Sequence, residues 1–552
     1  MKSNRRNFIQ KLGVGTAGMG LAGALPLSSE AKTPLKDKGD EQVLFVGDNI
    51  AVANTKYGKV RGYILRGIHT YLGIPYGADT SGENRFMPPQ KPKAWSDVKP
   101  AVWWGNTAPQ IMEKRYADAY SSFVDHWNYD DVSEDCLKLN VWTPALDAKK
   151  RPVIVWLHGG GFVNGNGIEQ DGYNGENLSR MGDVVFCSLN HRLGTLGYTN
   201  LAGVGGEKFA ASGNVGMLDI VAALEWVRDN IANFGGDPGS VTIIGQSGGG
   251  AKVCALTAMP SAKGLFHKAV ALSGSMLGGV SKEYSEKLGE LVLKEAGLAP
   301  NEIGKLQQIP WREYIDIANR AATKAADEAR RLGLTRAGFS PVADGRFMMD
   351  KPFYADNSHF SSEIPMIICS TFNESSPSRV DSSLEKVSLA DVKEKIKTRF
   401  GDKSSEVADA YAKVFPDKKP IEIWSMVMSN RKNAIAAADA KSKQKAPVYL
   451  AWFGWQPPLF DGRMRAFHCN DICFWFNNTD LMLTHTGGGA RPRRLSEKMA
   501  KTFVNFARTG NPNGGGLPTW PRYTSENGET MILDDVCLVR NDPDREARKA
   551  LP

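Results

Sequence analysis

The chain of 552 residues is 42% hydrophobic and 23% charged, which is typical of a globular protein with enough apolar material for a large core. Its net charge of +8 falls to +5 when residues 1–31 are left out, too small an excess to indicate a nucleic-acid-binding protein. No stretch after residue 31 reaches the roughly 18 apolar residues of a membrane-spanning helix, so we expect no stable membrane insertion.

Residues 1–31 are predicted to be an export signal that is removed from the mature protein. They combine a basic start, a weakly apolar Gly/Ala/Leu run and a small-x-small site at 29–31. The stretch 4–11 resembles a twin-arginine signal, R-R-x-F-x-x-K, which implies twin-arginine export machinery as a partner of the precursor and a bacterial periplasmic or secreted product. A disordered basic tail is the alternative. Residues 32–42 are expected to be a linker.

Strand and helix patterns alternate through the rest of the chain. Residues 43–75 alternate apolar and polar side chains between turn residues, which predicts an antiparallel meander. The continuous apolar runs 152–158 and 184–192 predict strands that are buried on both faces. Residues 217–234 carry apolar side chains at helical spacing and end at the G-G-D-P stop 235–238.

The later part of the chain continues this alternation around a polar helical stretch, 281–334, which is predicted to form a cap. Further strands are predicted at 136–144, 241–244, 268–274, 364–375 and 447–455. A helix at 496–510 is expected to lead into a turn-rich segment. The alternation predicts an α/β fold with a large, mostly parallel central sheet and helices on both faces. We expect one domain, 43–540, followed by a C-terminal tail, 541–552.

The stretch 241–250, VTIIGQSGGG, predicts a nucleophile at Ser247. An apolar strand runs into the pattern G-x-S-x-G, and residues 251–259 can continue as a helix. A sharp strand-to-helix turn holds the serine in strained backbone geometry and leaves no room for side chains two residues away. The turn aims the Gly248 amide and the helix N-terminus at the place where negative charge develops. On its own, the pattern also fits an ordinary glycine-rich loop.

A serine hydroxyl needs a base, usually an imidazole that a carboxylate holds in place. Among the eight histidines, His468 follows the last predicted strand, and catalytic groups in such sheets come from loops at the carboxyl ends of strands. His485 is the alternative base. Glu374 lies two residues beyond the strand run IICSTF and fits the acid. Asp344, in the turn-like PVADG, is the competing acid, with a structural role favoured for it.

The motif HGGGF, at 158–162, follows the apolar strand 152–158 and predicts an oxyanion hole. The amides of Gly160 and Gly161 can point at a carbonyl oxygen, with Gly248 as the third donor. Removing one such donor typically costs about 3 to 4 kcal/mol of transition-state stabilisation. A flexible loop is the alternative interpretation of the motif.

Together these motifs resemble the type B carboxylesterases, the cholinesterase-like and para-nitrobenzyl esterase-like family of the α/β-hydrolase fold. The resemblance covers nearly everything from about residue 45 to residue 525. The stretch 133–141 resembles the EDCLYLNV signature of the family, and 234–249 resembles its FGGDPxxVTIxGxSxGG serine signature. Further family blocks are matched at 72–76, 190–194, 213–216, 341–345 and 509–513.

The resemblance implies a serine hydrolase that cleaves a small-molecule carboxylic ester through an acyl-enzyme, without a metal or an organic cofactor. It implies Ser247 as the nucleophile, His468 as the base and Glu374 as the acid. It also implies the oxyanion donors Gly160, Gly161 and Gly248, and Ser273 as a support for the histidine loop. In relatives the GGG-x motif goes with tolerance for bulky alcohol groups.

The chain departs from the family pattern at three places. Gln246 and Gly248 stand where the family often has Glu and Ala. The acid lies in Asn373-Glu374-Ser375 rather than in D-E-G. Cys136 has no upstream cysteine with which to form the disulfide found in animal relatives.

Substrate contacts are predicted at Trp127 and at Phe162, which follows the three glycines. Trp127 resembles a cholinesterase tryptophan that binds cations, although a packed loop position is the favoured alternative. An amidase, a carbamate hydrolase or a lactonase would use the same catalytic residues. Non-catalytic adhesion proteins of the family lack one or more triad residues, all of which are present in this chain.

Overall fold

The computed structural model describes residues 42–111, 123, 131–331, 337–349 and 358–552. Residues 43–552 form one compact unit. The predicted export signal, the linker up to residue 41 and Trp127 lie outside the described residues.

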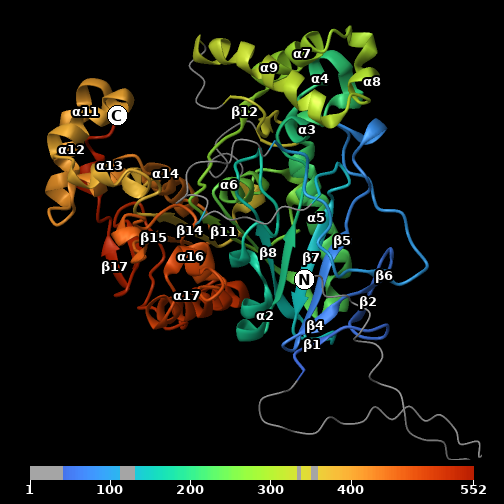
Figure 1. The fold of residues 1–552 in the computed structure, drawn as a ribbon, viewed down its shortest axis with the longest axis horizontal. Coiled ribbons are helices and arrows are strands. Elements are labelled where there is room, and N and C mark those ends of the chain that lie inside the picture. The colour runs from blue at the N-terminus through green and yellow to red at the C-terminus, as the bar shows by residue number, and fades with distance from the viewer. Residues whose placement is uncertain (1–41, 112–122, 124–130, 332–336, 350–357) are drawn as a thin grey trace, which may run out of the picture. The chain divides into compact units, whose positions relative to one another are not determined.

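A central twelve-stranded sheet runs through the described part of this unit (Figure 1). The strands, in the order in which they lie side by side, are β1 Leu44–Phe45, β4 Tyr63–Leu65, β5 Ile68–Pro75, β7 Lys138–Thr143, β9 Val185–Leu189, β8 Arg151–Leu157, β10 Gly236–Gln246, β11 Lys268–Leu272, β14 Met366–Thr371, β15 Val448–Phe453, β16 Glu529–Leu533 and β17 Leu538–Asn541. The pairs from β9 through β16 are parallel, while those from β1 to β9 and the last pair are antiparallel. The predicted α/β class with a mostly parallel centre and an antiparallel N-terminal part is confirmed.

Helices cover both faces of this sheet because its central strands are apolar on both sides. Along β8, Val153 and Val155 face one core, while Ile154 and Trp156 face the other. The first core is closed by α5 Val215–Asn230, α6 Gly248–Leu256 and α14 Arg431–Ser442. The second is closed by α2 Glu176–Gly182, α15 Ile472–Trp475 and α17 Ala490–Thr509.

The predicted N-terminal meander is divided between two sheets. β2 Val52–Thr55 and β3 Gly58–Arg61 pair antiparallel, but β3 pairs in parallel with β6 Lys99–Pro100 in a separate three-stranded sheet. Only β1, β4 and β5 of this region join the central sheet.

The predicted cap contains three helices, α7 Lys282–Glu295, α8 Ile303–Leu306 and α9 Trp311–Arg331. They share an apolar cluster with α4 Ala202–Gly205 nearby and lie together in Figure 1. A second helical group comprises α11 Leu389–Phe400, α12 Ser404–Val414 and α13 Pro420–Val427. Within the described ranges, no helix combines the length and apolar character needed to cross a membrane.

The segment 511–528 after α17 is rich in turns, as expected, but the residues from 541 onward do not form a separate tail. β16 and β17 extend the central sheet, and α18 Arg545–Arg548 packs its Ala547 against the α11–α13 group. The two strands are short and combine Glu, Thr, Arg and Asn with apolar residues, so no long apolar run marks them in the sequence.

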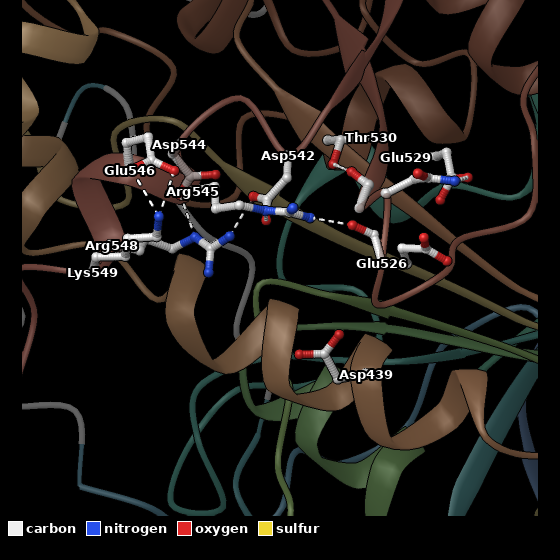
Figure 2. A network of polar contacts seen from close by, with 12 residues as sticks. Asp439, Glu526, Glu529, Thr530, Asp542, Asp544, Arg545, Glu546, Arg548 and Lys549 are labelled. Carbon is white, nitrogen blue, oxygen red and sulfur yellow. Dashed lines mark hydrogen bonds and ion pairs between the residues drawn. The ribbon is translucent and has the colours of Figure 1, made fainter.

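Ion pairs hold this C-terminal segment to the unit. Asp544 is fully buried and lies 3.3 Å from Arg431 of α14 and 3.0 Å from Arg548. Arg431 is also buried, over the ring of Trp452. Figure 2 shows Arg548 between Asp544 and Asp542, with the exposed pair Glu546–Lys549 at the edge of the network. The buried Asp544 carboxylate therefore attaches the last residues of the chain to the interior through its ion pairs.

We expect Asp544→Asn to lower the free energy of unfolding by about 3 to 5 kcal/mol, because it leaves the buried Arg431 guanidinium without a counter-charge. Urea unfolding followed by tryptophan fluorescence measures the change. Glu546→Gln in the exposed pair is the matched control and should change stability by less than about 0.5 kcal/mol. Equal effects of the two substitutions would contradict the proposed anchoring.

Candidate active site

Ser247 lies at a sharp turn between β10 and α6. Its φ and ψ are 56° and −123°, a conformation that a residue with a side chain rarely adopts. The turn is fastened by two backbone hydrogen bonds: the Ser247 N–H donates to the Leu272 carbonyl at 2.8 Å, and the Ser247 carbonyl accepts from the Ala251 N–H at 3.0 Å. Ser247 is partly exposed, whereas the residues on either side of it are buried. The turn therefore presents the serine at the carboxyl end of β10.

The glycines after Ser247 let α6 start in direct contact with the end of β8. A Cβ atom at Gly249 would stand 2.0 Å from the Leu157 carbonyl oxygen. One at Gly248 would stand 2.0 Å from the Gly161 carbonyl oxygen. These separations are far below van der Waals contact, so only glycine fits at either position. The Gly248 that replaces the family alanine thus has a local steric reason in this chain.

The loop that follows β8 carries the predicted oxyanion donors. Gly160 and Gly161 have φ values of 78° and 63°, and the Gly160 carbonyl accepts hydrogen bonds from the N–H groups of Val163 and Asn164. Phe162 ends the glycine run, and its ring packs edge-on against Tyr198 at 5.5 Å. Phe162 is only 5% exposed, so most of its surface belongs to the core. The structure therefore brings Gly161 and Gly248 together and uses Phe162 to anchor the loop.

Glu374 and His468 are joined by a hydrogen bond. The Glu374 Oε2 atom lies 2.5 Å from His468 Nδ1, and its Oε1 atom accepts from the Thr371 N–H at 3.0 Å. The Glu374 side chain is 6% exposed and that of His468 is 32% exposed. The two loops are also linked by their backbones, since the Asn373 N–H donates to the Ala466 carbonyl. A buried carboxylate thus orients an imidazole that is partly exposed.

Gln246 connects the serine turn to this histidine. Its amide nitrogen lies 3.2 Å from His468 Nε2, and its amide oxygen accepts from the Cys469 thiol. Because Nδ1 faces the Glu374 carboxylate, Nε2 is the nitrogen available to accept a proton. His468 therefore contacts the residue that directly precedes the candidate nucleophile, Ser247.

A cavity of about 150 Å³ lies beside the glycine loop. The loop contributes Val163 and Asn164, and helix α9 contributes Ile315 and Asn319. Its remaining lining residues come from the segments 109–111 and 193–195 and from Phe339. The lining is largely apolar with a few amide groups, which suits a small organic molecule.

The carboxylesterase family model matches residues 49–547 of the chain. The chain belongs to the carboxylesterase family. It is 33% identical over 512 residues to a para-nitrobenzyl esterase of Bacillus subtilis, covering 91% of this chain and 98% of that relative. It is 31% identical over 495 residues to a phenmedipham hydrolase of Pseudarthrobacter oxydans, covering 88% and 95% of the two chains.

Solved structures agree with this assignment. An esterase of Clostridium hathewayi, described as hydrolysing aliphatic aromatic polyesters, superposes with a TM-score of 0.79 at 35% identity, covering 92% of this chain and 99% of that one. A Geobacillus stearothermophilus carboxylesterase superposes with a TM-score of 0.74 at 33% identity, covering 91% and 100%. The predicted α/β-hydrolase fold and the predicted class, a carboxylic ester hydrolase of the serine type, are confirmed.

The competing candidates in this carboxylesterase have other surroundings. His485 is buried in α16 Leu483–Thr486, where its ring packs against Phe467. Asp344 accepts hydrogen bonds from the N–H groups of three following residues and from Asn214, which is a turn-forming role. Neither is hydrogen-bonded to His468 among the described residues. The favoured choice of Glu374 over Asp344 is therefore in accord with the contacts.

Ser273 lies next to the serine turn, but no contact supports the predicted support of the histidine loop. Its N–H donates to the Cys369 carbonyl at 2.7 Å, and its hydroxyl has no hydrogen-bond partner among the described residues. Its contribution stays a prediction. All seven cysteines lie in the described residues and all are free thiols, so the Cys136 disulfide of animal relatives is absent, as the sequence indicates.

Two ionisable groups near the site escaped the sequence analysis. Asp471 is fully buried, and burial together with the nearby Glu374 charge raises its pKa to about 7. Lys252 of α6 is also fully buried, and burial lowers its pKa to about 7. A lysine within the otherwise apolar run 251–259 is the one sequence signal that could have drawn attention to it.

We expect Gly248→Ala to lower kcat/KM of the carboxylesterase by about 100-fold. The new methyl group would displace the Gly161 carbonyl, and a shift of about 1 Å in a catalytic loop costs about that factor. Hydrolysis of p-nitrophenyl butyrate measures the effect. Gly304→Ala in α8, where a Cβ would meet nothing within 4 Å, is the control and should retain full activity. An unchanged kcat/KM in Gly248→Ala would contradict this prediction, because it would show that the loop can shift without loss of activity.

Proposed function

We propose that this carboxylesterase hydrolyses carboxylic esters with Ser247 as nucleophile, His468 as general base and Glu374 as the acid that orients it. Ser247 Oγ attacks the ester carbonyl while His468 Nε2 takes its proton. The resulting oxyanion accepts hydrogen bonds from the N–H groups of Gly160, Gly161 and Gly248.

The tetrahedral intermediate then collapses to an acyl-enzyme, and the alcohol leaves with the proton that His468 returns to it. A water molecule then attacks the acyl-enzyme in the same way. His468 takes a proton from the water while its oxygen adds to the acyl carbon. The bond to Ser247 Oγ then breaks, His468 returns the proton to the serine oxygen, and the carboxylic acid is released. Only side chains, backbone amides and water take part in these steps, so no metal or organic cofactor is required.

The hydrogen bond between His468 Nδ1 and Glu374 Oε2 is the observation that carries this proposal. It favours the tautomer in which Nδ1 bears the proton and Nε2 holds the lone pair needed by a base. Further support comes from the strained turn at Ser247 and from the contact between Gln246 and the same imidazole. Ser273 is proposed to support the histidine loop from beneath the turn.

Ser247→Ala should abolish hydrolysis of p-nitrophenyl butyrate, because it removes the attacking oxygen. Glu374→Gln should lower kcat by about 10,000-fold, since an amide no longer holds the productive tautomer of His468. Steady-state kinetics at pH 7.5 measure both. Asp344→Asn is the matched control, with kcat expected within threefold of wild type in the folded protein. If Asp344→Asn abolished turnover and Glu374→Gln did not, the assignment of the acid would be overturned.

We also propose that the alcohol part of the substrate can be bulky. The three-glycine loop carries no side chains toward a substrate, and the 150 Å³ cavity beside Val163 and Asn164 offers apolar space. Phe162, although mostly buried, and Trp127 are proposed as contacts to this group. Turnover of tert-butyl acetate at a measurable fraction of the n-butyl acetate rate is expected, and complete rejection of the tertiary ester would contradict the idea.

Amide, carbamate and lactone substrates in the same assay test the other activities open to such a triad.

The basic N-terminus is proposed to direct the precursor to twin-arginine export machinery. Residues 1–31 would be the cleaved signal, 32–42 a linker, and the protein would act in the bacterial periplasm. Mass spectrometry of the exported protein tests this directly, with a mature chain that starts at residue 32 as the expected result. An exported chain that keeps Arg5 and Arg6 would contradict cleavage.

A further inference from the structure

Lys252 occupies an unusual position for an ionisable side chain. It lies in α6, five residues after Ser247, and every residue of that helix is buried. Its exposed fraction is 0%, and taking an ammonium group out of water is costly unless it gains strong interactions in return. Burial lowers its pKa to about 7, opposed by the charge of Glu169. Stability alone gives no reason to keep a lysine at such a place.

The Lys252 side chain contacts both ends of the glycine loop. Its ammonium group donates to the His158 carbonyl at 2.9 Å, which is its one hydrogen bond among the described residues. The same group lies 5.9 Å from the centre of the Phe162 ring. His158 begins the loop and Phe162 ends it, so a single cation contacts both points at which the loop joins the core.

The backbone that Lys252 holds leads directly to the proposed oxyanion donors. The His158 ring, through Nδ1, lies 2.9 Å from the Gly159 carbonyl. That carbonyl and the Gly160 N–H belong to one planar peptide group and point in opposite directions. Fixing the Gly159 oxygen therefore fixes the direction in which the Gly160 N–H donates.

The surroundings of His158 favour its neutral form. Burial, with smaller effects from the Lys252 charge and from the stacked ring of His191 at 5.0 Å, lowers the pKa of His158 well below its ordinary value. A neutral imidazole with the proton on Nδ1 can donate to the Gly159 carbonyl. Glu169 is the acidic group that faces this cluster, and it accepts a hydrogen bond from Tyr173 at 2.8 Å.

We propose that Lys252 is a positioning residue of the oxyanion loop, which it holds through the His158 carbonyl so that the Gly160 amide points at the developing charge. The inference rests on the proposed function, because it concerns the same loop and the same step. Its contribution should appear in the transition state rather than in ground-state binding, since the loop donates most strongly when the oxyanion forms.

The fold supplies a matched control in Lys441 of α14. Lys441 is also 0% exposed, donates to a backbone carbonyl, that of Ser361, at 2.7 Å, and has a pKa that burial lowers to about 7. It lies outside the proposed catalytic machinery. Lys252→Met and Lys441→Met therefore remove equivalent buried ammonium groups at two different places.

The test measures kcat and KM of wild type, Lys252→Met and Lys441→Met with p-nitrophenyl butyrate. It also measures inhibition by an alkyl trifluoromethyl ketone, which forms a tetrahedral oxyanion on the serine. We expect Lys252→Met to lower kcat by about 100-fold with KM changed less than threefold, in the range seen for loss of one oxyanion donor. Affinity for the ketone should fall by a similar factor, while Lys441→Met should keep kcat within twofold.

Lys252→Gln provides a second variant that keeps an N–H donor without the charge. A partial recovery of kcat relative to Lys252→Met is expected if the hydrogen bond to His158 carries the effect. Wild-type kcat in a folded Lys252→Met, or equal losses of kcat in Lys252→Met and Lys441→Met, would overturn the inference. If Ser247→Ala kept the wild-type kcat, the proposed function itself would be overturned. Failure of the Lys252 inference and failure of the proposed function can therefore be told apart.

Discussion

The close contact between the end of β8 and the start of α6 is the constraint on which the candidate site depends. Carbonyl oxygens of Leu157 and Gly161 occupy the space where side chains at Gly249 and Gly248 would lie. A backbone carbonyl can approach another backbone so closely only where the residue that it faces has no Cβ atom. The serine turn and the glycine loop therefore pack as one unit, and any change that separates them would move the proposed nucleophile and the proposed oxyanion donors apart.

The central sheet explains how distant parts of the chain meet at this unit. Ser247 follows β10, and Glu374 follows β14, two strands further along the sheet. His468 follows β15, which pairs in parallel with β14. Because the carboxyl ends of parallel strands open at the same edge, their loops converge without any local sequence relation. The backbone link between Asn373 and Ala466 then fixes the acid and histidine loops to each other.

Apolar packing and buried charge have separate roles in this molecule. The two cores on either face of the sheet are formed by aliphatic and aromatic side chains from strands and helices. Two of the buried ionisable groups contact a loop or a terminus: Lys252 donates to the start of the glycine loop, and Asp544 pairs with Arg431 beside α18. In a low-dielectric interior such interactions are strong, and they are directional where apolar contacts are not. The apolar core can therefore accept changes in packing, whereas the few buried charged groups fix the positions of the backbone groups that they contact.

Local patterns in the sequence were enough for the fold class, most central strands, the serine turn and the glycine loop. Buried parallel strands such as 152–158 are continuous apolar runs, and the two glycine motifs are read within ten residues each. The sequence did not predict the strands β16 and β17 because each is short and includes polar residues beside its apolar ones. It placed the start of α17 six residues late because those first residues are rich in arginine.

The partners of individual side chains depend on the tertiary structure. Whether Glu374 or Asp344 faces His468, why residue 248 must be glycine, and what Lys252 contacts all depend on which strands and helices lie side by side. Periodicity and motifs encode the interactions of a residue with its neighbours along the chain. Contacts between residues a hundred positions apart arise only once the sheet has ordered its strands.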